Sequence, residues 1–548
     1  MPSYHRTAEM KTENFPCGTG ISALCKVCRA VSELGGETPA CWPSAPIYMY
    51  GGVKMRKGNK IFYDMLLLTG ANFLLRLAGM SFQVYLSSRI GAAGIGLLQL
   101  VLSVAALAFT VGSAGIRTCA TYLSAGELGR GNGGNLSGVL AGCCQYSLLF
   151  GGATAIALWY AAPWLCEAWI GSRDAIAAVR LFALFLPVKC LHGVMTGYFT
   201  AVKRVGSTVV VAFLEQGCAI AVTFALLARW AGVDSGQSAF AVAAGSCAAD
   251  VLGFLLLLAL RPKTGQRGSG RTPYGRIFRV SLPLALADTL RSGLNTIEDL
   301  IIPRQLALFT GTVNAMADYG MIRGMVFPVL MFPAAILFSL AELLIPEFSR
   351  CAACGSKNRV QYLARQGLRA AMLFGLCAGG MMFALANALG DLLYQNRQVG
   401  SLLRLYAIFV PMLYTDALVD AMCKGLGQQN ANARYNTLTS FLDVVFLWYL
   451  LPKLGLSGYA VSFAVTHLVN FALSLRRLIR VSGIRLAVGK PVLAAVCAAA
   501  AGGVASLLNG VLPAGGCYLV LLGGLWYLCG IVDRSDGLWL RKLTGGRY

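Results

Sequence analysis

Long apolar stretches follow one another from Ile61 almost to the end of the chain. There are about fourteen, and each approaches the roughly 20 residues that an α-helix needs to cross the hydrocarbon core of a bilayer. Stretches of this length and number exclude a disordered chain, a disulfide-stapled secreted scaffold and a transmembrane β-barrel. The composition agrees, because 57% of the residues are hydrophobic and only 13% are charged. The sequence therefore predicts an all-α polytopic membrane protein.

The spacing of these stretches divides the chain into five parts. We expect a disordered or wrongly assigned cytoplasmic tail over 1–60, an N-terminal six-helix lobe over 61–260, a cytoplasmic linker over 261–276, a C-terminal six-helix lobe over 277–480, and two extra helices with a cytoplasmic tail over 481–548. Among the lobe helices, single helices are expected over 92–116, 136–165, 316–345 and 402–422. Basic residues follow Met55 directly, so translation starting at Met55 is an alternative reading of the tail.

The positions of Lys and Arg predict how the chain is oriented. They number 46 against 23 Asp and Glu, which gives a formal net charge of +23. With both termini cytoplasmic, we count about 26 of them in the inner loops and only about six in the outer loops, as the positive-inside rule requires. We therefore expect a multi-pass protein of the plasma membrane whose basic loops meet membrane lipids rather than nucleic acid. The outer loops are too short for a catalytic domain, so we expect no enzyme.

The two groups of six helices show signs of an internal repeat. Arg76 and Arg89 are 13 residues apart in the first helix, and Arg291 and Arg304 are 13 residues apart in the seventh. Each member of the second pair lies 215 residues after its counterpart. This predicts a parallel pseudo-repeat about an axis along the membrane normal, with a site between the two lobes.

Arginines inside the apolar helices are the candidate substrate-binding residues. A charge at the bilayer centre costs about 2.5–3.5 kcal/mol on insertion scales, so it usually faces a wet cavity or a partner. Arg76 and Arg291 occupy equivalent mid-helix positions, where they would form a cationic chamber suited to phosphate or pyrophosphate. Arg323 is a further candidate. Arg304 and Arg89 are weaker candidates, because arginines near a helix end can simply snorkel to the interface.

Acidic residues in the same helices are candidates for binding a coupling ion, either H⁺ or Na⁺, and the membrane potential is the third possible driving force. They are Asp288, Glu298, Glu215, Asp416 and Asp420. Structural pairing is an equal alternative for each, and Arg291 has Asp288 three residues before it and Glu298 seven after it. No metal or cofactor is expected, because the 18 cysteines are scattered, the three histidines are isolated, and neither a phosphate loop nor a Gly-x-Ser-x-Gly motif occurs.

Several short motifs resemble the stage V sporulation protein B family. In chain order they are GAAGIGL (91–97), GYFTA (197–201), EDLIIPR (298–304), YGMIRGMVFP (319–328), LIPEFS (344–349) and LPKLGLSGY (451–459). The resemblance covers the chain from Ile61 onward. It points to the polysaccharide-exporter and lipid II flippase branch of the multidrug/oligosaccharidyl-lipid/polysaccharide (MOP) flippase superfamily.

The resemblance implies a fold of six plus six helices that opens as a V-shaped central cavity, often with two extra helices that border a groove for a lipid tail. It also implies that Arg76 and Arg291 match the cavity arginines that engage pyrophosphate in lipid II flippases. The expected function is translocation of an undecaprenyl-pyrophosphate-linked cell-wall or polysaccharide precursor by alternating access, with spore cortex peptidoglycan synthesis as one setting. The alternative is a cation-coupled multidrug exporter of the same superfamily. The expected partners are the lipid-linked glycan and membrane lipids.

Overall fold

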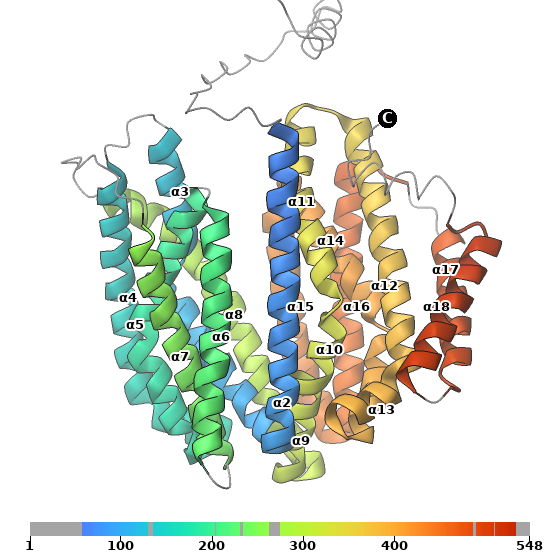
Figure 1. The fold of residues 1–548 in the computed structure, drawn as a ribbon, viewed down its shortest axis with the longest axis horizontal. Helices are drawn as coiled ribbons and strands as arrows, with labels where there is room; N and C mark the ends of the chain where they lie inside the picture. Colours follow the sequence, from blue (N-terminus) through green and yellow to red (C-terminus); the bar gives the residue numbers. More distant parts are fainter. Residues whose placement is uncertain are drawn as a thin grey trace, which may run out of the picture. The chain divides into compact units, whose positions relative to one another are not determined.

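The computed structural model describes residues 57–129, 135–202, 204–230, 234–261, 274–485, 489–508 and 510–532. The chain divides into two compact units, Met1–Lys60 and Ile61–Tyr548, and the helices below lie in the second, apart from the first residues of α2. Within the described residues every regular element is a helix (Figure 1). The expected tail up to residue 56, and residues 262–273 of the expected linker, fall outside the described residues.

The first half of the chain forms helices α2 to α7. Their bounds are α2 (Lys57–Ser113), α3 (Ile116–Gly129), α4 (Leu136–Leu165), α5 (Ile176–Ala201), α6 (Val205–Arg229) and α7 (Ser235–Ala259), with the short π-helix η2 (Cys166–Ile170) and 3-10 helix η3 (Arg173–Ala175) between α4 and α5. The predicted helix over 136–165 is confirmed in α4. Small residues allow the close packing of α6 and α7, because a Cβ at Gly245 would lie only 2.5 Å from the carbonyl oxygen of Ala219.

The helix expected over 92–116 has a different form. It continues the first helix across a kink at Gly91, where φ is 70°, and the two together are α2. It ends at Ser113, and the chain turns before α3 begins. The turn needs glycine, because Gly115 has a φ of 71° and a Cβ there would lie 2.9 Å from the Ser281 carbonyl oxygen of α8 (Tyr274–Thr310). The sequence did not predict α3, whose apolar pattern is interrupted by polar residues.

The second half continues after α8 with two broken helices. Its elements are α9 (Thr312–Gly320), the π-helix η4 (Met321–Val326), α10 (Phe327–Met331), α11 (Ala334–Ala353), α12 (Lys357–Tyr394), α13 (Arg397–Ala407), α14 (Val410–Gly425), α15 (Gln429–Leu454) and α16 (Leu456–Ser482). The prediction of single helices over 316–345 and 402–422 is wrong. The chain bends by 63° before α11 and by 54° before α14. Pro333 lies at the first bend and Pro411 just after the second, where the missing N–H and the ring interrupt helical hydrogen bonding.

Helices α17 (Gly489–Ala505) and α18 (Val511–Leu528) form the last pair, which lies beside α12 in Figure 1. They pack on each other and on α12, around a small core of their own. Within this core the hydroxyl of Tyr518 donates to the carbonyl oxygen of Leu376 at 3.0 Å. The pair is thus attached to the second half through α12.

Nine helices in the described part of the chain are long and apolar enough to cross a membrane, or eleven if each bent pair counts as one span. One of the nine, Gly70–Leu128, contains the kink at Gly91 and so joins helices that the sequence separates. Helix α8 is not among the nine, and it has seven charged residues. The chain is therefore a polytopic membrane protein whose described residues are all-helical and contain nine to eleven candidate spans, where the sequence predicts about fourteen.

Contacts of α2 with η4 and with α8 are among those that join the two halves. The first part of α2 runs along η4, where the Gln83 amide donates to the Gly324 carbonyl oxygen at 3.1 Å. Beyond the kink, α2 runs along α8, where the Ser103 hydroxyl donates to the Asp299 carboxylate at 2.8 Å. Residues of α2, α8 and η4 consequently border the space shared by the two halves.

The same local arrangement occurs once in each half. The guanidinium of Arg180 in α5 lies 5.3 Å from the centre of the Trp159 ring in α4. The guanidinium of Arg404 in α13 lies 5.4 Å from the centre of the Phe383 ring in α12. Both residues of the second pair are 224 positions after their counterparts.

Candidate functional site

A polar cavity of about 540 Å³ lies in the second half of the chain, lined by α8, η4, α10, α11 and α14 to α16. Charged side chains gather in it: Arg291, Glu298, Asp299, Arg323, Asp416, Asp420 and Asp443. Charges inside a membrane protein are costly and usually mark a substrate or ion pathway. This cavity is therefore the main candidate site.

Arg323 is held in the cavity by two carboxylates of α8. Its guanidinium lies 3.0 Å from Glu298 and also pairs with Asp299. Arg323 belongs to the π-helix η4, and such wide turns are frequent at functional sites because they change the direction in which a side chain points. Among the described residues, neither Asp288 nor Glu298 forms an ion pair with Arg291, and Glu298 pairs with Arg323.

Asp443 of α15 is a buried carboxylate that the sequence candidates left out. It accepts hydrogen bonds from the Ser462 hydroxyl at 2.5 Å and from the Thr466 hydroxyl at 3.2 Å, both on α16. A signal was available, because Asp443 interrupts an apolar run in the same way as the residues that were chosen. Its hydroxyl partners, by contrast, have no signature in the sequence.

Asp416 and Asp420 lie one turn apart on α14. The Asn470 amide donates to Asp416 at 3.1 Å, and the other carboxylate oxygen of Asp416 is buried without a hydrogen-bond partner among the described residues. Asp420 accepts from the Asn432 amide at 2.7 Å and pairs with Lys424 at 2.6 Å. Asp416 thus has fewer polar partners than Asp420.

Arg291 lines the same cavity and, within the described ranges, makes no ion pair. The charge of the lining is nevertheless mainly acidic, since five carboxyl groups accompany two guanidinium groups. The cationic chamber expected from Arg76 and Arg291 facing one another is not what lines this cavity.

Arg76 lines a second cavity of about 390 Å³ between α2 and α11. Its guanidinium lies 4.9 Å from the centre of the Phe338 ring and donates to the Met331 carbonyl oxygen at 3.5 Å. Glu342 shares this cavity. Phe338 lines both cavities, so the spaces that contain Arg76 and Arg291 adjoin at this ring.

Three other candidates lie outside both cavities. Arg89 and Arg304 are exposed, and the guanidinium of Arg89 lies 5.7 Å from the centre of the Tyr85 ring. Asp288 is exposed on α8. None of the three lines the cavities described above.

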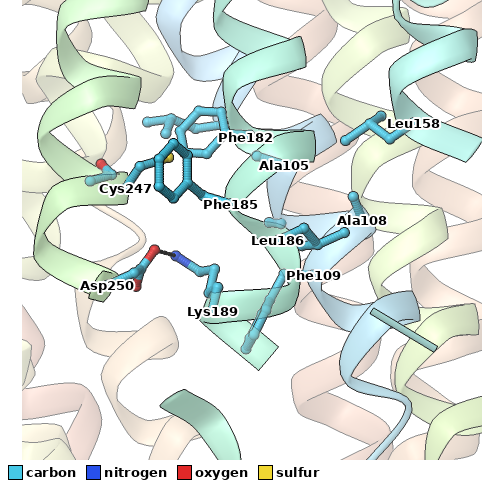
Figure 2. A pocket seen from close by; sticks show the side chains of 13 residues that line it. Ala105, Ala108, Phe109, Leu158, Phe182, Phe185, Leu186, Lys189, Cys247 and Asp250 are labelled. Atoms are coloured by element: carbon cyan, nitrogen blue, oxygen red, sulfur yellow. Dashed lines mark hydrogen bonds and ion pairs between the residues drawn. The ribbon is translucent and has the colours of Figure 1, made fainter. Parts of the chain in front are cut away.

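The first half contains a smaller cavity of about 200 Å³, shown in Figure 2. Its walls are mostly apolar, and at one side Lys189 of α5 points toward Asp250 of α7 at 2.9 Å (Figure 2). The Lys189 ammonium also lies 5.5 Å from the centre of the Phe109 ring. One turn further along α5, His192 lies 2.9 Å from Glu215 of α6. Glu215 therefore has a partner within the first half, and Lys189 is a partly buried charge that the sequence candidates missed.

Membrane-spanning helices that enclose charged cavities have the organisation of a membrane transporter. Residues 146–523, more than half of the chain, match the family described as lipid II flippase MurJ. The chain belongs to this family, so it is a transporter and not an enzyme.

Two curated relatives come from Bacillus subtilis (strain 168). Stage V sporulation protein B is 22% identical over 415 residues, which cover 72% of this chain and 79% of that protein. Sporulation protein YkvU is 24% identical over 280 residues, which cover 49% of this chain and 62% of that protein. The predicted resemblance to stage V sporulation protein B and to the lipid II flippases is confirmed.

Solved structures share the fold. An inward-facing multidrug resistance MATE family transporter of the MOP superfamily has a TM-score of 0.63 at 14% identity, covering 75% of this chain and 96% of its own. Lipid II flippase MurJ in an inward closed conformation has a TM-score of 0.63 at 12% identity, covering 84% and 99%. A MOP superfamily transporter from Pyrococcus furiosus has a TM-score of 0.55 at 14% identity, covering 76% and 96%. These likenesses show a MATE/MurJ-like fold.

Proposed function

We propose that this protein is a flippase that moves an undecaprenyl-pyrophosphate-linked cell-wall or polysaccharide precursor across the plasma membrane by alternating access. Membership of the MurJ family supports a lipid-linked precursor as the substrate. The observation that carries the proposal is the position of Arg76 and Arg291 on two adjoining cavities that share Phe338. Two guanidinium groups from different halves would grip a pyrophosphate from both sides, since each offers a planar pair of donors.

The other arginines take lesser parts in this proposal. Arg323 acts as a positioning residue, because two carboxylates already occupy its guanidinium. Arg304 and Arg89 lie outside both cavities and would contact the substrate only as it enters or leaves.

The acidic groups of the large cavity are proposed to bind the coupling cation, H⁺ or Na⁺. Glu298, Asp416 and Asp420 line that cavity. The unpartnered oxygen of Asp416 supports this role, since a bound cation would satisfy it. Glu215 lies outside that cavity beside His192, and Asp288 is exposed, so neither is favoured as an ion ligand. A bound cation would also couple the cycle to the membrane potential.

The proposed architecture is two six-helix lobes over 61–260 and 277–480 related by a parallel pseudo-repeat, with a V-shaped central cavity and both termini cytoplasmic. The matching pairs Arg180–Trp159 and Arg404–Phe383 support the repeat. The biological setting is proposed to be peptidoglycan synthesis, including that of the spore cortex. The names of the two Bacillus relatives support this setting.

Native mass spectrometry of the purified protein tests the substrate. The wild type and Arg76→Ala/Arg291→Ala are compared for binding of lipid II, a lipid-monophosphate analogue and a cationic dye. We expect the double variant to lose lipid II binding by at least about tenfold, because a charge-assisted hydrogen bond contributes about 1.5–3 kcal/mol. Arg279→Ala/Arg365→Ala is the matched control, since both arginines are exposed and lie outside the cavities. An equal loss of lipid II binding in the control would contradict the assignment of Arg76 and Arg291 as pyrophosphate-binding residues.

The alternative function, a cation-coupled multidrug exporter, is favoured by the acidic lining of the large cavity. Carboxylates that outnumber guanidinium groups suit a cationic solute. In the same experiment, dye binding that survives the loss of both arginines but disappears in Asp416→Asn, without any preference for lipid II, would replace the flippase by the exporter.

A further inference from the structure

Two cysteine thiols face one another between the last two helices. Cys497 lies on α17 and Cys529 directly follows α18, and their Sγ atoms are 3.8 Å apart. A disulfide bond is about 2.05 Å long, so a movement of less than about 2 Å would join the two sulfurs. Neither residue lines the cavities described above, and the proposed transport does not use them.

The contacts on either side of the thiols fix this arrangement. The Trp526 indole donates to the Ala494 carbonyl oxygen at 3.3 Å. The Lys490 ammonium donates to the Gly530 carbonyl oxygen at 3.4 Å. Both bonds join the start of α17 to the end of α18, so helix packing holds the two cysteines in register.

The two thiols differ in access. Cys497 is buried, whereas Cys529 is exposed. Basic side chains surround this end of the pair, because Lys490 contacts Gly530 and the Arg369 guanidinium donates to the Ile531 carbonyl oxygen at 2.6 Å. Lys and Arg near the ends of membrane helices usually mark the boundary with water. A water-soluble reagent would therefore reach Cys529 first.

We propose that Cys497 and Cys529 form an oxidation site that closes into a disulfide, with a low-molecular-weight disulfide as the oxidant. The Cys529 thiolate attacks one sulfur of the oxidant, and one small thiol leaves. The Cys497 thiolate then attacks the Cys529 sulfur of this mixed disulfide, and the second small thiol leaves. The protein loses two electrons and two protons, which convert the oxidant into two thiols.

The bond would connect α17 covalently to the end of α18. The pair is attached to the rest of the chain through α12. The disulfide would therefore limit movement of the two helices against each other while leaving their attachment to α12 unchanged. The redox state of the surroundings would set the rigidity of this helix pair.

The test uses the purified full-length protein, reduced, freed of reductant and incubated with oxidised glutathione. Remaining thiols are alkylated, and the protein is digested without reduction for peptide mass spectrometry. We expect the loss of two free thiols and a cross-linked peptide pair containing residues 497 and 529. Cys497→Ser and Cys529→Ser should lack this pair. Cys517→Ser, another cysteine of α18, is the matched control and should retain it.

Two results would overturn the proposal. One is a glutathione adduct on Cys529 that never resolves to Cys497, and the other is a bond from Cys529 to a different cysteine. Amide hydrogen exchange provides a second measurement on the same samples. Amides of α17 and α18 should exchange more slowly in the oxidised wild type but not in Cys497→Ser treated in the same way. Unchanged exchange in the oxidised wild type would show that the bond does not restrain the helices.

Discussion

Arg323 is a charge whose environment depends on residues far away in the sequence. Its partners Glu298 and Asp299 lie on α8, more than twenty residues earlier, and all three side chains are less than one third exposed. The cost of placing these groups in the membrane is offset only while all of them are present. Removing the guanidinium would leave two neighbouring carboxylates without a counter-charge.

We predict that Arg323→Ala lowers the free energy of unfolding by about 3 kcal/mol, because breaking a buried ion pair leaves uncompensated charge. Denaturant unfolding in detergent micelles measures the change. Arg350→Ala provides the control, since Arg350 is 75% exposed beside Glu347 and exposed pairs contribute less than about 1 kcal/mol. Similar losses of unfolding free energy in the two variants would show that the ion pairs of Arg323 with Glu298 and Asp299 stabilise the protein no more than an exposed pair does.

The Lys189–Asp250 pair in the first half allows a double-mutant cycle. We predict that Lys189→Met and Asp250→Leu are each strongly destabilising, because each leaves one charge in the mostly apolar cavity. The double variant should be more stable than either single variant, since no unpaired charge remains. Thermal unfolding of the four proteins gives the coupling energy between Lys189 and Asp250. If the losses of stability in the two single variants add up in the double variant, the two groups do not stabilise each other.

Depth in an apolar helix was enough to identify several charged residues of the large cavity from the sequence, including Arg291, Glu298 and Asp416. It could not identify their partners. The contacts of Arg323 and Asp443 join different helices, and hydroxyl partners such as Ser462 look like ordinary helix residues in the sequence. Lys189 and Asp443 followed the same depth rule and were left out.

Helices α2 and α9 meet through two glycines. A Cβ on Gly96 would lie 2.3 Å from the Met316 carbonyl oxygen, and a Cβ on Gly320 would lie 1.9 Å from the Ala92 carbonyl oxygen. Both distances are shorter than any real contact of a Cβ, so an added methyl group must push the backbones apart. This is one of the places where the two halves of the chain approach most closely.

We predict that Gly320→Ala costs about 1–3 kcal/mol of stability, as overpacking usually does, and lowers the flipping rate because it opens the α2–α9 contact. Thermal unfolding and transport in proteoliposomes measure the two effects. Gly293→Ala is the matched control, because it lies within α8 with nothing within 4 Å of its Cβ position. Alanine there should be neutral or slightly stabilising. A Gly320→Ala protein that matches this control would show that the contact tolerates a methyl group.

Helices without internal breaks were well predicted, and α4 begins and ends where the apolar pattern does. The broken ones were not. An apolar pattern cannot distinguish one continuous helix from α10 and α11, whose bend of 63° reflects local backbone geometry rather than hydropathy. In the same way Gly91 and Gly115 have positive φ values, which the hydropathy pattern does not reveal.

At the scale of the whole molecule, the sequence correctly predicts a polytopic membrane transporter. It predicts a cationic site, however, whereas the large cavity of the structure is mainly acidic. The expectation of facing arginines came from their equivalent positions in a repeat. In the structure, Arg76 and Arg291 line separate cavities that adjoin at Phe338. Any substrate that contacts both arginines must extend past this ring, and alternating access would change the separation of α2 from α8.

A cross-link between the halves tests whether α2 must move against α8 during transport. The hydroxyl oxygens of Ser103 in α2 and Thr296 in α8 are 3.4 Å apart, so Ser103→Cys/Thr296→Cys places two thiols across the contact. We predict that oxidising this pair stops the flipping of a pyrophosphate lipid in proteoliposomes but leaves its binding intact, because the halves can no longer separate there. Reduction should restore flipping, and each single variant should flip under both conditions. Undiminished flipping by the cross-linked protein would show that transport proceeds without movement of α2 against α8.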